Sequence, residues 1–133
     1  ETEALLRSYP NLRAIIAPTT VGIAAAGKVL SDKGLKGQVE LTGLGLPSEM
    51  AEYIESGVSR WMYLWNPIDV GYLAGYTADA LFKGTITGAL GDTFEAGRLG
   101  TKEVIADGDA TQIMLGPPFR FDASNIAEWK DVY

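Results

Sequence analysis

The chain has 133 residues, of which 47% are hydrophobic and 21% are charged, so it can hold one ordinary hydrophobic core and is neither disordered nor collagen-like. Its 11 Lys and Arg residues against 17 Asp and Glu residues give a net charge of −6, which disfavours nucleic acid and anionic lipid as partners. The absence of histidine and cysteine removes the commonest general base and metal ligand, thiol catalysis, zinc–thiolate sites and disulfides.

The chain opens on Glu1, with no initiator Met and no basic and apolar leader, and residues 4–7 already have the character of a helix. We therefore expect a fragment of a longer protein. No apolar stretch approaches the roughly 20 residues that a bilayer-spanning helix needs, so we expect no such helix.

The next part of the chain alternates predicted strands with predicted helices. Residues 12–18 form a short apolar run that ends at a proline, which is typical of a buried strand. Thr20 is then predicted to cap an Ala-rich helix that Gly34 ends. Residues 38–42 alternate polar and apolar side chains as a second strand, and a turn leads into a helix that ends at Gly57.

A third cycle repeats this order. Residues 59–65 are predicted to form a strand. Asn66 is predicted to cap the next helix, which covers residues 67–83 and ends at Gly84. Three successive strand–helix units with short connections favour a parallel sheet with helices on both of its faces, an α/β lobe of the Rossmann-like kind. Three units are too few to close a barrel.

The alternation stops after the third helix. Residues 93–97 and 102–105 are predicted to pair as a hairpin, and residues 107–109 to form a turn. Residues 111–115 predict a further strand, and residues 122–130 a short terminal helix.

Ligands of open α/β sheets bind beyond the carboxyl ends of the strands, where helix N-termini and free backbone N–H groups meet. This rule selects residues 18–20, 43–47 and 65–67, which hold hydroxyls, an amide, glycines and an indole but no nucleophile with a base. Such a set predicts a site for a neutral polar molecule such as a sugar, with no catalytic residue, metal or cofactor. The candidate ligand-binding residues are Thr19, Thr20, Gly45, Trp65 and Asn66.

Each candidate also has a structural interpretation. Trp65 ends an apolar run and could be a core residue. Asn66, which precedes a proline, could cap the following helix, and either Thr19 or Thr20 could cap an earlier one. Gly45 belongs to a Gly-x-Gly that lacks the third glycine of a phosphate-binding loop, so the nucleotide signal is weak.

Four stretches carry a resemblance to a known family: residues 12–18, 42–50, 64–72, and 115–121 with Asn125-Ile126. They resemble the type I periplasmic solute-binding proteins of ABC transporters, in the sugar-binding group related to rhamnose-binding and furanosyl-autoinducer-binding proteins. In this family two similar α/β lobes close on a sugar at their hinge. The resemblance implies a non-catalytic periplasmic protein that delivers a sugar to an ABC transporter permease. The motifs are most similar to those of the rhamnose-binding members, which implies a deoxyhexose such as rhamnose as the ligand.

The resemblance also assigns parts of the chain. It implies that residues 1–66 and 111–133 form the C-terminal sugar-binding lobe, and that residues 67–110 are a crossover helix and hairpin that belong with an absent N-terminal lobe. Without that partner, we expect the chain to form a homo-oligomer through residues 67–110, by exchange of this segment between copies.

The resemblance gives the candidate residues roles. Thr19 and Thr20 stand where the family supplies polar contacts, and Trp65 and Asn66 where relatives place a contact near the hinge. Gly45 stands where many relatives carry an aspartate that binds sugar hydroxyls, and this departure favours a deoxy sugar with an apolar methyl group. Two alternatives remain: the effector-sensing domain of a LacI-type transcription regulator, which shares the fold, and a nucleotide-dependent reductase, for which the glycine pattern is incomplete.

Overall fold

The computed structural model describes residues 1–132, and the chain divides into two compact units. The first unit consists of Glu1–Leu64 together with the segment from Pro118 onward, and the second is Trp65–Pro117. Residues 65–66 and 111–117, which we assigned from sequence to the sugar-binding lobe, therefore belong to the second unit. Residues 65–66 lead into the helix that Asn66 caps, and the strand over Ala110–Ile113 pairs with its hairpin neighbour and not with the first unit's sheet.

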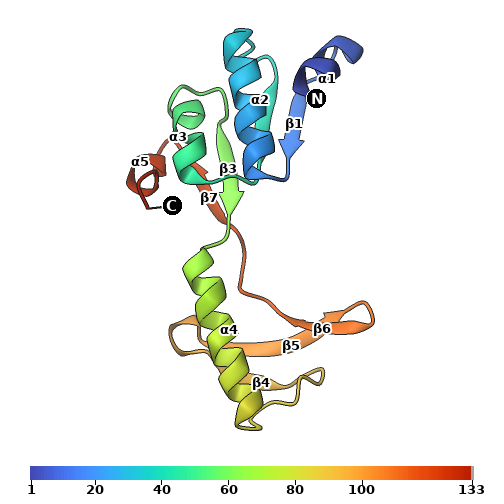
Figure 1. Ribbon diagram of the computed structural model, residues 1–133, viewed down its shortest axis with the longest axis vertical. Coiled ribbons are helices and arrows are strands. Elements are labelled where there is room, and N and C mark those ends of the chain that lie inside the picture. Colours follow the sequence, from blue (N-terminus) through green and yellow to red (C-terminus); the bar gives the residue numbers. More distant parts are fainter. Residues whose placement is uncertain (133) are drawn as a thin grey trace. The chain divides into compact units, whose positions relative to one another are not determined.

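The first unit follows the predicted alternation of strands and helices. Its elements, labelled in Figure 1 where there is room, are α1 (Thr2–Ser8), β1 (Ala14–Ala17), α2 (Thr20–Asp32), β2 (Glu40–Gly43), α3 (Pro47–Glu55), β3 (Trp61–Leu64), β7 (Phe119–Asp122) and α5 (Ile126–Trp129). Strands β1 and β2 pair in parallel, with Ala17 opposite Gly43, and a parallel bridge joins Leu44 to Tyr63. The α/β fold and the parallel order of the first three strands are thus confirmed.

The last strand of this unit was not predicted. β7 pairs antiparallel with β3, with Phe121 opposite Met62. We expected a helix over residues 122–130, but Asp122 ends the strand and accepts hydrogen bonds from the backbone N–H and hydroxyl of Ser124, so the chain turns there. The helix α5 is consequently only four residues long.

A single core lies between the sheet and the helices α2 and α3. Strand residues alternate between the two faces of a sheet, so one face carries Leu41 and Met62 inward while the other carries Ile16, whose side chain is 76% exposed. The largest fully buried side chains of this core are Ile23, Leu30, Leu41, Met50, Ile54, Met62, Phe121 and Ile126.

The second unit is a long helix with a three-stranded antiparallel sheet. Its elements are α4 (Pro67–Phe82), β4 (Thr93–Glu95), the 3-10 helix η1 (Gly97–Leu99), β5 (Thr101–Asp107) and β6 (Ala110–Ile113), in the sheet order β4-β5-β6. The predicted hairpin and the turn at residues 107–109 are confirmed. A small core of Leu73, Ala80, Ile86, Phe94, Ala96 and Val104 holds the unit together.

Arg98 ties η1 to the first turns of α4. Its guanidinium lies 3.9 Å from the centre of the Tyr72 ring and forms an ion pair with Asp69. The Tyr72 hydroxyl in turn lies 3.3 Å from that of Tyr76, and this hydrogen bond is the main reason why the pKa of Tyr72 is lowered. The two tyrosines are therefore packing residues within this unit.

Within residues 1–132, no helix is both long enough and apolar enough to cross a bilayer.

Asp92 organises the loop before β4. Its Oδ2 accepts hydrogen bonds from the backbone N–H groups of Thr87, Gly88 and Ala89 and from the Thr87 hydroxyl, at 2.6 to 3.2 Å. The donors of Thr87 hold the pKa of this carboxyl below its ordinary value of 3.8. A carboxyl with a lowered pKa in the folded state stabilises the fold above the unfolded pKa, and this stabilisation is lost as the pH falls through the folded pKa.

We expect the free energy of unfolding to decrease as the pH falls below about 4, and Asp92→Asn to flatten this part of the profile. Urea denaturation of the chain at a series of pH values, followed by circular dichroism, measures the effect. Asp109→Asn is the control, because the Asp109 carboxylate makes no hydrogen bond or ion pair among the described residues. If the free energy of unfolding of Asp92→Asn falls with pH as steeply as that of the control, the loop does not depend on this carboxylate.

Candidate functional site

The carboxyl ends of three strands meet at one edge of the first unit's sheet. The Leu44 N–H donates to the Ala17 carbonyl at 2.9 Å, and the Gly45 N–H lies 3.4 Å from the Tyr63 carbonyl. Figure 1 shows β1 and β3 pointing toward this same end of the unit. The segments that follow β1 and β2, residues 18–20 and 43–47, therefore lie together at this edge, as the sequence predicted.

Thr19 and Thr20 begin α2 at this edge. The hydroxyl of Thr19 accepts a hydrogen bond from the Gly22 N–H at 3.1 Å, so Thr19 is the helix cap and the sequence-based assignment of the cap to Thr20 is wrong. The cause is backbone geometry: Thr19 is extended, with φ −143° and ψ 147°, while Thr20 is already helical. The Thr20 hydroxyl makes no hydrogen bond with the described residues, and it remains available to a ligand.

Gly45 is fully packed. A Cβ at this position would lie 2.9 Å from each of three core atoms: Ile23 Cγ2, Met50 Cγ and Met62 Sδ. The side-chain direction of residue 45 therefore points into the core, and an aspartate could not be placed here without displacing the core. Gly45 can offer only its backbone to a ligand.

Gly43 has a structural role that the sequence reading did not assign. Its φ is +145°, and a Cβ built on it would lie 1.9 Å from the Ala17 carbonyl oxygen. Only glycine allows β1 and β2 to approach this closely at the edge. The signal in the sequence was a glycine at the end of an otherwise regular strand, which commonly marks a close backbone approach.

Trp65 and Asn66 open the second unit, directly after the last residue of β3. Trp65 is 47% exposed, so it is not a core residue. Asn66 caps α4, because its Oδ1 accepts a hydrogen bond from the Ile68 N–H at 2.9 Å. The Asn66 amide nitrogen donates to no group among the described residues, so this side chain can cap the helix and still bind a ligand.

Thr42 is a further polar residue near the edge. Its hydroxyl oxygen is enclosed by protein and has no hydrogen-bond partner among residues 1–132. An unpaired buried hydroxyl costs about 1–3 kcal/mol. The alternation of β2, which places Thr42 on the face opposite Leu41, was the sequence signal that could have singled it out.

The chemistry of these segments is neutral. Residues 18–20, 43–47 and 65–67 contain no titratable side chain. Among residues 1–132, no three His, Cys, Asp or Glu side chains are grouped so that they could hold a metal ion. The segments present hydroxyl, amide and backbone groups and an exposed indole, which suit hydroxyl groups and C–H faces and not phosphates or carboxylates.

Comparison with known proteins identifies relatives. The family model of the periplasmic binding protein domain matches residues 1–86. A solute-binding protein of an ABC transporter from Clostridium phytofermentans, with bound L-rhamnose, is 53% identical, with a TM-score of 0.87 over 99% of this chain. A sugar ABC transporter protein from Actinomyces odontolyticus is 42% identical, with a TM-score of 0.82 over 96% of this chain.

A more distant structure shares the fold. LsrB from Clostridium saccharobutylicum in complex with AI-2 has a TM-score of 0.77 over 96% of this chain at 22% identity. This chain covers 44%, 40% and 43% of the three matched structures, so it spans less than half of their length.

Proposed function

The chain belongs to the periplasmic binding protein domain family, and from that premise we propose that it is the C-terminal lobe of a solute-binding protein that captures a deoxyhexose such as L-rhamnose for an ABC importer. In this proposal the protein is non-catalytic and works outside the cytoplasmic membrane. Its partners are the sugar and the transporter permease.

The observation that carries the proposal is the uncharged edge that holds Thr19, Thr20 and the backbone of Gly45, in a chain 53% identical to a protein with bound L-rhamnose. Rhamnose presents hydroxyl groups and an apolar methyl group. Hydroxyl and amide side chains can bind the former, and the exposed indole of Trp65 can pack against an apolar face of the sugar. Gly45 offers a ligand only its backbone and places no carboxylate at the edge, because the side-chain direction of this residue points into the core.

In the whole protein we propose that the second unit, Trp65–Pro117, belongs with a second lobe. The compact units change at Leu64–Trp65 and at Pro117–Pro118, so two chain connections join them. Two connections between lobes are a geometry that allows hinge closure around a ligand. Trp65 and Asn66, which directly follow β3, would then belong to one of these two connections.

A sugar panel tests this function and its specificity. A chimera in which this chain replaces the matched 44% of the Clostridium phytofermentans protein supplies the rest of the fold. We expect L-rhamnose at 100 times its Kd to stabilise the chimera by about 2.7 kcal/mol and to raise its Tm by several degrees. D-Ribose and D-galactose should leave the Tm unchanged. Stabilisation by a charged ligand alone, or by no sugar, would contradict the proposal.

The second unit carries the surface through which we propose that this 133-residue chain associates with a second copy. An apolar groove of about 470 Å³ lies between α4 and β6, lined by residues that include Val70, Leu81 and Ile113. Nearby, Phe82 is 91% exposed and Ile68 is 65% exposed. A face of this kind is commonly covered by protein, and a second copy of the chain would bury the groove together with these exposed side chains.

Light scattering on the eluate of a size-exclusion column tests this association. We expect the parent chain to elute at twice its monomer mass of 14.2 kDa at micromolar concentration, and Leu81→Asp to elute as a monomer because it places a charge in the groove. Leu90→Asp is the matched control, since Leu90 is 67% exposed and does not line the groove. A parent chain that is monomeric at every concentration would refute the association.

A further inference from the structure

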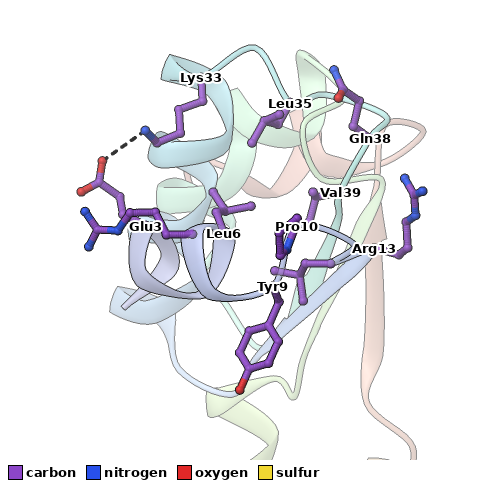
Figure 2. Close-up of a pocket in the computed structure, with 11 residues that line it drawn as sticks. Glu3, Leu6, Tyr9, Pro10, Arg13, Lys33, Leu35, Gln38 and Val39 are labelled. Carbon is purple, nitrogen blue, oxygen red and sulfur yellow. Dashed lines mark ion pairs between the residues drawn. The ribbon is translucent and has the colours of Figure 1, made fainter.

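A second pocket lies at the opposite end of the first unit's strands from the candidate sugar edge. It is lined by residues of α1, of the segment 9–13 before β1 and of the segment 33–39 before β2, and its volume is about 260 Å³. Figure 2 shows its side chains as sticks: the apolar Leu6, Leu35 and Val39 lie toward the middle of the group. This volume is slightly below the roughly 300–1,000 Å³ that is usual for ligand pockets, so only a small molecule fits.

The polar side chains of this pocket stand at its two sides. In Figure 2, Arg13 and Gln38 lie on one side of the apolar group, and the ion pair between Lys33 and Glu3, 3.4 Å apart, lies on the other. The apolar floor is thus flanked by cationic groups, with a single carboxylate among them.

The charge of the pocket differs from that of the rest of the molecule. The chain has a net charge of −6, yet the pocket is lined by Arg7, Arg13 and Lys33 against Glu3 alone. Seven of the Lys and Arg side chains form ion pairs with carboxylates among the described residues. Arg7 and Arg13 are in none of these pairs, so the pocket is lined by two guanidinium groups that have no ion-pair partner in the described part of the chain.

We propose that this pocket binds a small amphipathic carboxylate, which lays its apolar body on Leu6, Leu35 and Val39 and its carboxylate against Arg13. A guanidinium binds a carboxylate through two parallel N–H···O hydrogen bonds, which are stronger than neutral ones. An apolar floor with one polar anchor selects a ligand that has both parts. Because this pocket lies at the amino ends of β1 and β2, its ligand is distinct from a sugar bound at their carboxyl ends.

An NMR titration of the ¹⁵N-labelled chain with hexanoate tests the proposal. We expect saturable shifts of the Leu6, Leu35 and Val39 amides. Hexanol, which has the same apolar body without the charge, should bind at least about tenfold more weakly, as should hexanoate to Arg13→Glu. Lys28→Glu is the matched control, because it makes the same charge change on α2 with an exposed side chain that does not line the pocket.

The control variant should bind hexanoate within twofold of the parent. Equal binding of hexanoate and hexanol, an unchanged Kd in Arg13→Glu, or the absence of saturable shifts would each overturn the proposal. Arg13→Lys distinguishes charge from geometry: it keeps the charge but loses the two-pronged hydrogen bond, and should fall between the parent and Arg13→Glu.

Discussion

Gly43→Ala is expected to lower the free energy of unfolding of the first unit by roughly 2–6 kcal/mol, the sum of about 1–3 kcal/mol for a strained backbone and about 1–3 kcal/mol for overpacking. The φ of Gly43 is +145°, which other residues rarely adopt. The added Cβ would lie 1.9 Å from the Ala17 carbonyl oxygen and 2.7 Å from its carbonyl carbon. These are backbone atoms of the neighbouring strand, so the methyl group fits only if β1 and β2 separate.

Urea denaturation followed by circular dichroism measures this loss. Gly34→Ala is the matched control, because Gly34 also has a positive φ, +63°, but a Cβ there meets nothing within 4 Å. It should therefore show the conformational cost alone, about 1–2 kcal/mol. If Gly43→Ala costs no more than Gly34→Ala, then the close approach of the two strands does not hold the edge together.

Trp65→Ala is expected to weaken the binding of L-rhamnose to the chimera by about 10- to 100-fold, or about 1.4–2.8 kcal/mol. The indole is 47% exposed immediately after the carboxyl end of β3, so it is free to stack on an apolar sugar face. Aromatic side chains in binding sites commonly contribute a few kcal/mol each when they are desolvated by the ligand. Isothermal titration calorimetry measures the change.

Two further variants separate stacking from other effects. Trp65→Phe keeps an aromatic face and should recover part of the affinity, since a smaller ring covers less of the sugar. Tyr9→Ala removes another exposed aromatic residue, 60% exposed, from the amino end of β1 and should leave the Kd unchanged. An unchanged Kd in Trp65→Ala would remove this residue from the site.

The first three strand–helix cycles could be predicted because local signals agreed with the fold. Apolar runs marked β1 and β3, and prolines and glycines marked where helices begin and end. β7 could not be predicted in this way. Its burial pattern is produced by pairing with β3, more than 50 residues earlier in the chain. The strand is also only four residues long, and the two prolines directly before it do not indicate a strand.

The candidate site was predicted at the level of the sheet edge, but not of individual atoms. The strand ends fix where residues 18–20 and 43–47 lie, so the placement of Thr19 and Gly45 at one edge follows from topology alone. Which threonine caps α2 depends on backbone angles that a sequence does not display. The core contacts around Gly45, and the unpaired hydroxyl of Thr42, depend on side chains from other elements and could be found only in the structure.

The proposed function requires that this chain supplies one half of a sugar-binding cleft. Calorimetric titration of the chimera with L-rhamnose tests this requirement directly, because residues 1–133 of this chain supply the whole of one lobe's contribution to the cleft. We predict one binding site per chimera and a Kd within about tenfold of that of the intact Clostridium phytofermentans protein. A folded chimera that releases no binding heat with L-rhamnose, while the intact relative does, would contradict the account.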